Sequence, residues 1–405
     1  MSVLTINGGS SSIKFALYQR GNPPRRGLHG KIERINLGGT RLTFTDPARQ
    51  QQDNQSIGNL DQRSAANFLC DWLESRIGFA AIVAAGHRVV HGGASYSEPQ
   101  RVTAQLIAEL HRISAYAPEH LPHEIALLDI FGTHSPGLPQ VACFDTAFHR
   151  DMPRVAKLLP IPRRFQAKGI ERYGFHGLSY LFLMEELARL TGDEAAQGRV
   201  ILAHLGNGAS LAAVRDGTSI DTSMGFTPAA GVPMSTRSGD LDPGLAWYLS
   251  QTEHMSAQQF HHMVNHESGL LGISETSSDL RDLLDQETTD TRAAEAVASF
   301  CYQIKKWIGA YAAALGGLDI VVFAGGIGEN SPAVRSRICE GLGFLGIELD
   351  EARNAATEPV ICSDASPVQV RVIRTDEEII IAKSVYAILD GADIKPHPDF
   401  KGTSP

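Results

Sequence analysis

The sequence predicts an α/β protein made of two related domains, each built around a mixed β-sheet. Its 405 residues correspond to two or three domains of ordinary size. A strand, a glycine-rich turn and a second strand open the chain at residues 2–19, and the same pattern returns at residues 199–215. Alternating helical and strand segments follow each copy, as is typical of α/β domains.

A short sequence repeat supports the relationship between the two halves. Asn-Gly-x-Ser stands at residues 7–10 and again at residues 207–210, half the chain apart. Three identical positions could agree by chance, but the flanking strand patterns agree as well. We therefore predict a duplicated architecture.

The periodicity of apolar residues predicts the elements in order. In the first half, strands are predicted at residues 2–6, 13–19, 28–34, 41–45, 82–90 and 139–144, and helices at 63–77, 103–116, 122–132 and 177–191. In the second half, strands are predicted at 199–204, 210–215, 319–324 and 369–373, and helices at 256–266, 279–286, 291–315, 332–342 and 376–390. The last helix is amphipathic and long enough to return to the first half and pack there.

No low-complexity linker marks a domain boundary, so topology alone places it near residues 148–155. We expect an N-terminal domain over residues 1–150, completed by a C-terminal helix at 380–405, and a C-terminal domain over residues 151–379. Each domain would then carry one of the two glycine-rich hairpins.

Composition and charge exclude several classes of protein. A net charge of −9 offers no basic field for a phosphate backbone, so nucleic acid is not an expected partner. The five cysteines form no Cys-x-x-Cys pair and are expected to be buried thiols in a reducing compartment. We expect no signal segment, and the most apolar later stretch, residues 310–328, is too short for a membrane span. A cytosolic protein without a membrane partner is the expectation.

Three glycine-rich turns, at residues 7–12, 206–210 and 325–331, each follow a predicted strand. Glycine lets the backbone approach a phosphate closely, and successive amides with serine hydroxyls can form an anion-binding concavity. A tight hairpin that needs a positive φ is the alternative interpretation of each turn. Since the chain has neither a P-loop nor a dinucleotide-binding glycine motif, another kind of phosphate cradle is predicted.

Two arginines lie among glycine, serine and threonine residues rather than on helix faces. Arg88 lies within residues 86–93, and Arg237 lies within residues 234–243. Guanidinium groups bind carboxylate and phosphate with planar, bidentate geometry, which suits an anionic acceptor and a migrating phosphoryl group. Structural arginines bonded to loop carbonyls are the alternative.

Asp145 and His176 are two further candidates. Asp145 follows a predicted strand, where α/β folds place catalytic groups, although it could instead cap the next turn. His176 lies next to Gly174 and Gly177, so its backbone is expected to be unusual. It could donate a hydrogen bond in the transition state or could simply be packed in the core.

The spacing of two groups of histidines does not match that of zinc ligands. His120 and His123 are three residues apart, and His261, His262 and His266 lie on a predicted amphipathic helix. Neither group has cysteine or carboxylate companions at suitable positions. We predict solvated helix faces and no structural metal.

The ordered motifs together resemble the acetate and propionate kinases of the acetokinase family, part of the acetate and sugar kinase, Hsp70 and actin superfamily. The resemblance runs from residues 7–14 to residues 374–382. Between these, matching motifs stand at residues 87–93, 144–149, 172–177, 204–210, 236–244 and 324–331. It implies two actin-like, ribonuclease H-like domains with the active site in the cleft between them.

The resemblance implies a site for ATP and ADP. The residues implied to face the phosphates are Ser10, Ser12, Lys14, His204, Leu205, Gly206, Asn207 and Gly208. Those implied to hold the adenosine are Asp279, Leu280, Arg281, Gly326, Ile327, Gly328, Glu329 and Asn330. Mg²⁺, with Mn²⁺ as a substitute ion, would be held by Asn7 and Glu377, and Glu378 is the close rival of Glu377.

The resemblance also implies an acceptor site and an activity. Arg88 would bind the carboxylate of the acid, and the other substrate-binding residues would be Val90, Phe175, Pro228 and His120. Arg237 and His176 would stabilise the transferring phosphoryl group, and Asp145 would act as acid/base or bind metal-bound water. The implied reaction is reversible, Mg²⁺-dependent, direct in-line transfer from ATP to acetate, giving acetyl phosphate and ADP. The resemblance further implies a homodimer.

Two departures from the family pattern concern the acceptor. Glu119, within residues 117–122, stands where an apolar residue would line the acyl pocket, and the loop at 228–237 also differs. A carboxylate in a dry pocket is costly, so Glu119 should turn to solvent or meet a cation, and we favour solvent. Propionate, and less readily butyrate, is therefore the alternative acceptor. An ATP-switched binding protein of Hsp70 or actin type is the alternative from another class.

Overall fold

A computed structural model describes residues 2–9 and 11–391 of the chain. These residues fold into two units. The first unit holds the described residues of Met1–Ala147 and Asp376–Pro396, and the second holds Phe148–Thr375. Ser10 and the last part of the predicted helix at 380–405, residues 392–405, lie outside the described residues.

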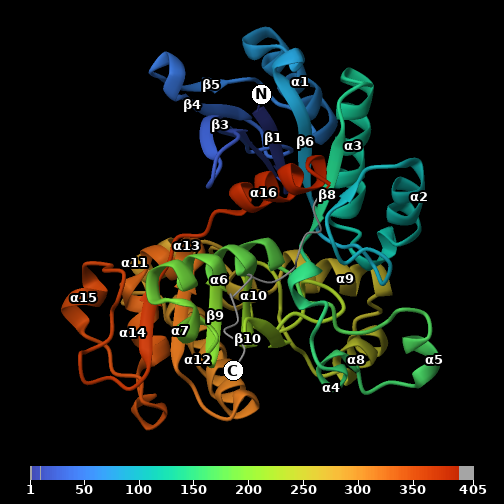
Figure 1. Ribbon diagram of the computed structural model, residues 1–405. Coiled ribbons are helices and arrows are strands. Elements are labelled where there is room, and N and C mark those ends of the chain that lie inside the picture. Colours follow the sequence, from blue (N-terminus) through green and yellow to red (C-terminus); the bar gives the residue numbers. More distant parts are fainter. Residues whose placement is uncertain (1, 10, 392–405) are drawn as a thin grey trace. The chain divides into compact units, whose positions relative to one another are not determined.

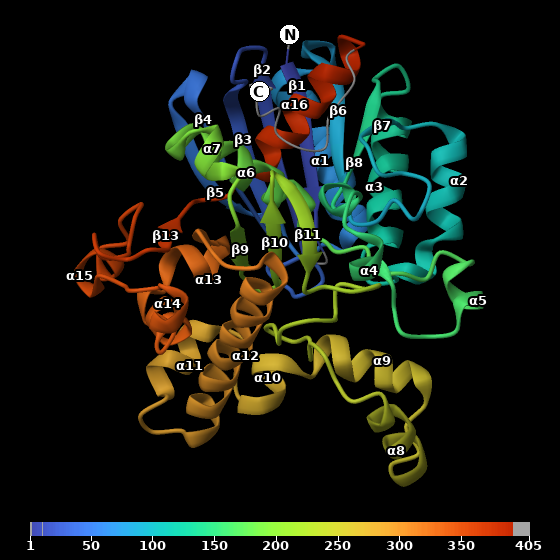
Figure 2. The same ribbon diagram turned by 60° about the horizontal axis from the view of Figure 1, so that its bottom comes forward.

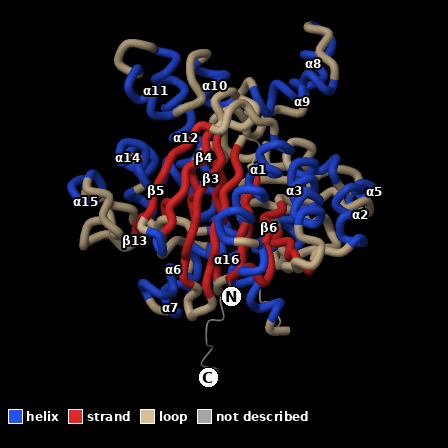
Figure 3. Tube along the Cα trace, turned by 90° about the horizontal axis from the view of Figure 1, so that it is seen from above, coloured by secondary structure: helices blue, strands red, loops and turns tan. Residues whose placement is uncertain are grey.

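The first unit is built on a mixed sheet with the strand order β5-β4-β3-β2-β1-β6-β8-β7 (Figure 1). These strands span Ser2–Gly8 (β1), Ser12–Gln19 (β2), Arg25–Glu33 (β3), Arg41–Asp46 (β4), Gln51–Ser56 (β5), Ile82–Val89 (β6), Gln100–Arg101 (β7) and Gln140–Phe144 (β8). β1 pairs antiparallel with β2 and parallel with β6, and β6 pairs parallel with β8. The strands β3, β4 and β5, which end in the edge strand β5, lie side by side in Figure 3.

Helices cover both faces of this sheet. They span Gln62–Ile77 (α1), Ala104–Arg112 (α2), Leu121–His134 (α3) and Glu377–Leu389 (α16). Phe15 and Leu17 of β2 belong to a core with α1 and α3, whereas the alternate residues Ala16 and Tyr18 pack against α16. This is the two-residue periodicity of a strand that is buried on both faces. The prediction that the last helix returns to the first half is confirmed.

The second unit is built on a sheet with the strand order β11-β10-β9-β12-β13. Its strands span Val200–Leu205 (β9), Ala209–Arg215 (β10), Thr218–Thr222 (β11), Ile320–Ala324 (β12) and Gln369–Val372 (β13). The helix α6 (Gly177–Thr191) shares a core with one face of these strands. The long helix α12 (Thr291–Leu315) contacts β9, β10 and β11 (Figure 2).

Shorter helices complete the second unit. They span Arg154–Lys157 (α4), Arg163–Gln166 (α5), Asp193–Ala196 (α7), Gly244–Thr252 (α8), Ala257–His266 (α9), Gly269–Ser274 (α10), Leu280–Gln286 (α11), Gly325–Asn330 (α13), Pro332–Cys339 (α14) and Glu351–Ala355 (α15). Single 3₁₀ turns of the chain lie at Pro47–Arg49, Phe79–Ala81, Ser114–Tyr116, Ala147–His149 and Gly343–Leu345. Among the described residues, no helix has both the length and the apolar character needed to cross a membrane.

The two sheets confirm the predicted duplication. In the first, β3, β2, β1, β6 and β8 are neighbours in that order, and β11, β10, β9, β12 and β13 follow the same order in the second. In both, an antiparallel hairpin comes first and two parallel strands are added beside its first strand. The hairpins are those whose turns carry Asn-Gly-x-Ser.

Several elements differ from the prediction. β5 and β11 were not predicted because their sequences lack a run of apolar residues. α8 was missed because it buries none of its residues and so shows no core-facing stripe. The turn predicted at 325–331 is the short helix α13, and the helix predicted at 103–116 ends as a 3₁₀ turn after α2. All five cysteines are free and buried, as expected.

Candidate active site

Polar side chains gather where three neighbouring parallel strands of the first unit end. Asn7 is the penultimate residue of β1, Arg88 that of β6, and Asp145 directly follows β8. The carboxyl ends of parallel strands meet at one edge of a sheet, which is where α/β folds bind ligands. Glu377, the first residue of α16, joins them by accepting a 2.7 Å hydrogen bond from Asn7 Nδ2.

Arg88 is held by a buried carboxylate. Its Nε donates to Asp145 Oδ2 at 3.0 Å and its Nη2 donates to the same oxygen at 2.5 Å. Asp145 is fully buried, and its backbone N–H donates to Val89 O. Burial opposes the charge on Arg88, but Asp145 and Glu124 outweigh it, so the pKa of the guanidinium lies above its usual value. The observed contact makes Asp145 an anchor for Arg88.

Glu124 also contacts Arg88 and was not found by the sequence analysis. Its Oε1 lies 3.5 Å from Arg88 Nη1, and its Oε2 accepts a 2.8 Å hydrogen bond from Val90 N–H. It is 3% exposed, in the first turn of α3. Burial raises the pKa of this carboxyl to about 7, although Arg88 and the Val90 N–H act in the opposite direction.

A sequence signal for Glu124 did exist. It lies three residues after the buried Leu121 and four before the buried Leu128, on the apolar face of the predicted helix. Glu119, which the sequence analysis singled out, is half-buried in the turn before that helix. His120, the residue that precedes α3, and the buried Val90 both belong to the same unit as Arg88.

The two glutamates at the start of α16 have different neighbours. Glu377 accepts from Asn7, as above, whereas Glu378 lines a small hollow with Lys14 and Arg26. Burial raises the pKa of Glu378, and the charge on Lys14 opposes that shift. Lys14 is paired with Asn7 across the β1–β2 hairpin, and Ser12 begins β2 at the tip of that hairpin.

In the second unit, His176 is held in a strained backbone conformation. It precedes α6 with φ at +59°, in the left-handed region, and Gly174 has φ at +74°. The expectation of an unusual backbone at His176 is confirmed. Its Nδ1 lies 2.8 Å from Ser210 Oγ, which is also in contact with the Tyr180 hydroxyl. These contacts fix the direction of the imidazole ring. The left-handed backbone of His176 is unfavourable for a residue with a side chain, so the surrounding structure has to stabilise it.

Arg237 and two histidines meet at the second hairpin. A Cβ placed on Gly208 would lie 3.3 Å from His176 Nε2 and 3.5 Å from Arg237 Nη1, so both groups face the turn backbone. The rings of His176 and His204 lie 4.5 Å apart between centroids. Arg237 Nη1 also donates to Pro228 O at 3.2 Å. The second unit therefore presents one guanidinium and two imidazoles beside a glycine turn.

A cavity of about 710 Å³ adjoins this turn. It brings together residues that lie far apart in the sequence: Gly206, Asn207, Asp279, Leu280, Arg281, Gly326, Ile327 and Asn330. Asp279 caps α11 and also pairs with Arg281, whose Nε donates to its Oδ1 at 3.1 Å. The volume and the glycine backbone on one side suit a nucleoside.

Some predicted site residues do not line that cavity. Gly328 is buried under β12, and Glu329 Oε1 instead accepts from the backbone N–H groups of Gly325 and Thr375. Leu205 is a core residue at the end of β9. Phe175 and Pro228 are buried in the second unit, whereas Val90 belongs to the first.

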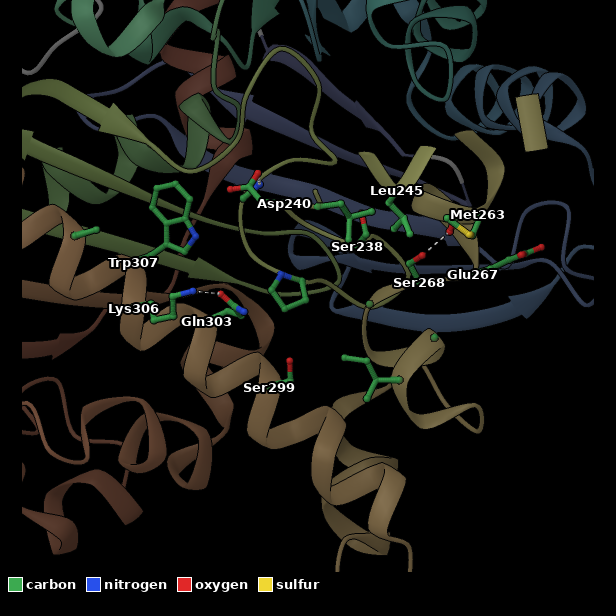
Figure 4. A pocket seen from close by; sticks show the side chains of 17 residues that line it. Ser238, Asp240, Leu245, Met263, Glu267, Ser268, Ser299, Gln303, Lys306 and Trp307 are labelled. Atoms are coloured by element: carbon green, nitrogen blue, oxygen red, sulfur yellow. Dashed lines mark hydrogen bonds between the residues drawn. The ribbon is translucent and has the colours of Figure 1, made fainter. Parts of the chain in front are cut away.

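A second cavity of the second unit, of about 740 Å³, contains none of the predicted site residues (Figure 4). Trp307, Lys306 and Gln303 line it from α12, and Lys306 Nζ donates to Gln303 Oε1 at 3.3 Å. Leu245 and Met263 line it from α8 and α9. Glycines also line this cavity, but its lining residues include neither an arginine nor a histidine.

The two sheets of like strand order, each with a glycine-containing hairpin, define a duplicated α/β protein. The chain belongs to the acetokinase family, whose sequence profile matches residues 2–383. An acetate kinase of Methylocella silvestris is 44% identical over 402 residues, covering 96% of this chain and 98% of that protein. A propionate kinase of Citrobacter rodentium is 42% identical, covering 95% and 96%.

Solved structures agree in fold. The acetate kinase of Porphyromonas gingivalis superposes with a TM-score of 0.84 at 36% identity, covering 96% of this chain and 99% of that chain. A propionate kinase from Francisella tularensis superposes with a TM-score of 0.88, also at 36% identity, covering 95% and 98%.

Proposed function

We propose that the protein catalyses the reversible transfer of the γ-phosphoryl group of ATP to the carboxylate of acetate, giving acetyl phosphate and ADP. Membership of the acetokinase family supports the reaction class. The observation that carries the acceptor chemistry is Arg88, a guanidinium anchored by Asp145 at the edge where β6 and β8 end. An anchored guanidinium can bind a carboxylate without first losing side-chain freedom.

In this proposal the phosphoryl group is stabilised by residues of the second unit. Arg237 supplies positive charge and His176 supplies a ring nitrogen, and both face the turn at Gly208. Phosphoryl transfer needs little covalent help from a protein, so position and charge account for most of the acceleration. The cavity lined by Asp279 and Ile327 would take the nucleoside.

The residues present fit a magnesium ion. Asn7 donates its amide Nδ2 to Glu377, which brings an amide and a carboxylate, both of which carry oxygen ligands, to the same place. Mg²⁺ binds through oxygen and keeps several waters. We propose Asn7 and Glu377, rather than Glu378, as these residues, since Glu378 faces Lys14. The ion would neutralise charge on the ATP phosphates.

We further propose a homodimer that acts in the cytoplasm. Large apolar side chains are exposed on α8, where Trp247 is 71% and Tyr248 is 61% exposed, and Leu241 nearby in sequence is 43% exposed. Exposed apolar groups of this size commonly mark an interface between proteins. The buried free cysteines suit a reducing compartment.

Hydroxylamine trapping tests the proposed reaction directly. The enzyme is incubated with ATP, Mg²⁺ and one short carboxylic acid at a time, and any acyl phosphate is captured as its hydroxamate. Acetate should give the highest kcat/KM. Formation of no acyl phosphate with any acid, from a protein that binds ATP, would favour the ATP-switched binding protein instead.

Propionate is the second candidate acceptor. The chain is similar to propionate kinases, and it departs from the family pattern at Glu119 and in the loop at 228–237. Both observations favour testing propionate as the acceptor. One methylene in an apolar pocket changes kcat/KM by a factor of about 10–200. The ratio of kcat/KM for the two acids in the same assay therefore separates the candidates.

A further inference from the structure

Asp145 leaves one edge of the Arg88 guanidinium for the acid, and Glu124 lies at that edge. Asp145 takes the edge formed by Nε and Nη2. The remaining nitrogen, Nη1, faces Glu124 Oε1 at 3.5 Å, the longest of the polar contacts that Arg88 makes. A second carboxylate that binds this guanidinium in a bidentate manner has to use Nη1 together with the remaining N–H of Nη2, because the Nε–Nη2 edge is taken.

An ionised Glu124 opposes such binding. Two carboxylates at one guanidinium nitrogen repel each other, and with Glu124 only 3% exposed there is little water to screen them. A protonated Glu124 removes the repulsion and supplies an O–H donor. Its other oxygen, Oε2, can continue to accept from Val90 N–H in either state.

We propose that Glu124 is a specificity-determining residue of the acceptor site, and that the acid binds to the form of the enzyme in which Glu124 carries a proton. This inference rests on the proposed function, since it takes Arg88 as the acid-binding group. Binding of the acid is then coupled to uptake of one proton from solvent. The site discriminates against acceptors with a second negative charge, which would meet Asp145 and Glu124 together.

The surroundings support this coupling. The charged groups that act on Glu124 are Arg88 of β6 and Asp145 after β8, and Glu377 at the start of α16 acts on Arg88. Burial holds the pKa of Glu124 near neutrality, about 7, so both of its forms are present in the range where the enzyme can be assayed.

The pH dependence of the acid's KM tests the proposal. In the wild-type enzyme, KM for acetate should rise about tenfold for each pH unit above the Glu124 pKa, with kcat nearly constant. Glu124→Gln keeps an oxygen for Val90 N–H and carries no charge, so its KM should lose this rise and fall below the wild-type value at alkaline pH. Asp129→Asn, at an exposed carboxylate on the same helix, is the matched control and should follow the wild type.

Calorimetry gives a readout without turnover. Acetate is titrated into the enzyme with ADP and Mg²⁺, at a pH above 7, in two buffers of different ionisation enthalpy. Uptake of about one proton by the wild type and none by Glu124→Gln is expected from the coupling. A Glu124→Gln variant that keeps the wild-type pH dependence of KM, or raises KM at every pH, would overturn the inference. Absence of acyl phosphate from the wild type with every acid would instead count against the proposed function.

Discussion

Arg237 tests the proposed chemistry at the scale of one residue. Its guanidinium faces the Gly208 turn, and its Nη1 donates to the Pro228 carbonyl oxygen and contacts the Met234 sulfur. Arg237→Ala should lower kcat by about 10²–10⁴ while the Kd for ATP stays almost unchanged, because the charge it stabilises exists mainly during transfer. Steady-state kinetics and equilibrium nucleotide binding measure the two effects, and wild-type turnover would remove Arg237 from the site.

Asn7 should behave differently. Asn7→Ala removes the amide that contacts Glu377 and an oxygen proposed to face Mg²⁺ or its water. The Mg²⁺ concentration needed for half-maximal activity should therefore increase several-fold, with a smaller effect on kcat at saturating Mg²⁺. The measurement is a Mg²⁺ titration at fixed ATP, with a thermal melt to show that the variant is folded. An unchanged titration curve would contradict the metal-water role.

Burial of the His87 side chain should make the free energy of unfolding depend on pH. It is 2% exposed on β6 against Phe131, and burial lowers its pKa to about 3. An unfolded histidine, with a pKa of about 6.5, gains a proton at a pH where the folded one does not, so the free energy of unfolding should fall as the pH drops from about 6.5 towards 3. The slope from this one residue is about 1.4 kcal/mol per pH unit.

Denaturant titrations at several pH values measure that slope. His87→Phe should reduce it by about one proton, since the variant has no imidazole to titrate. His261→Phe, at an exposed histidine on α9, is the control and should leave the slope unchanged. Equal slopes in wild type and His87→Phe would show that the folded His87 accepts a proton as readily as the unfolded one.

At the scale of elements, the junction of β12 and α13 forms one wall of the nucleoside cavity. Gly325 has φ at +76°, and a Cβ there would lie 2.6 Å from Leu205 O, so only glycine fits between the strand and the helix. Gly326, the next residue, lines the cavity. A Cβ added there would meet no neighbouring heavy atom of the described residues within 4 Å. The two neighbouring glycines are therefore needed for different reasons. Gly325 allows the backbone conformation, and Gly326 leaves open space that a ligand would occupy.

This pair gives a prediction with an internal control. Gly325→Ala should lower the free energy of unfolding by more than about 1 kcal/mol and weaken ADP binding, because the backbone must move. Gly326→Ala should leave the free energy of unfolding within about 0.5 kcal/mol of wild type. Thermal or denaturant unfolding compares the two. Equal stabilities would mean that the β12–α13 junction tolerates a side chain.

At the scale of the whole molecule, the prediction concerns assembly. Light scattering should give twice the 43.7 kDa mass of one chain. Trp247→Glu should shift the protein towards the monomer, since a charge would replace a large apolar contact, while Gln251→Glu on the same exposed helix should not. A wild-type protein that remains monomeric at micromolar concentration would refute the proposed homodimer.

Much of the architecture was determined by local sequence. The hairpins at 2–19 and 199–215 and the alternation of helices and strands were predicted because apolar periodicity and glycine turns act over a few residues. The same local signals singled out Arg88, Asp145, His176 and Arg237, which stand beside glycine or at the ends of strands. Polar or fully exposed elements, such as β5 and α8, left no periodic pattern and were missed.

Only the tertiary structure decided which of these residues meet. Asn7 and Glu377 are 370 positions apart, and they pair because α16 returns to the first sheet and begins at the end of β1. The same return places Glu378 beside Lys14, a difference that two consecutive glutamates cannot show in the sequence. Glu124 contacts Arg88 because α3 packs against the strands that end there. Local periodicity fixes the face on which a side chain lies, but long-range packing determines what that face contacts.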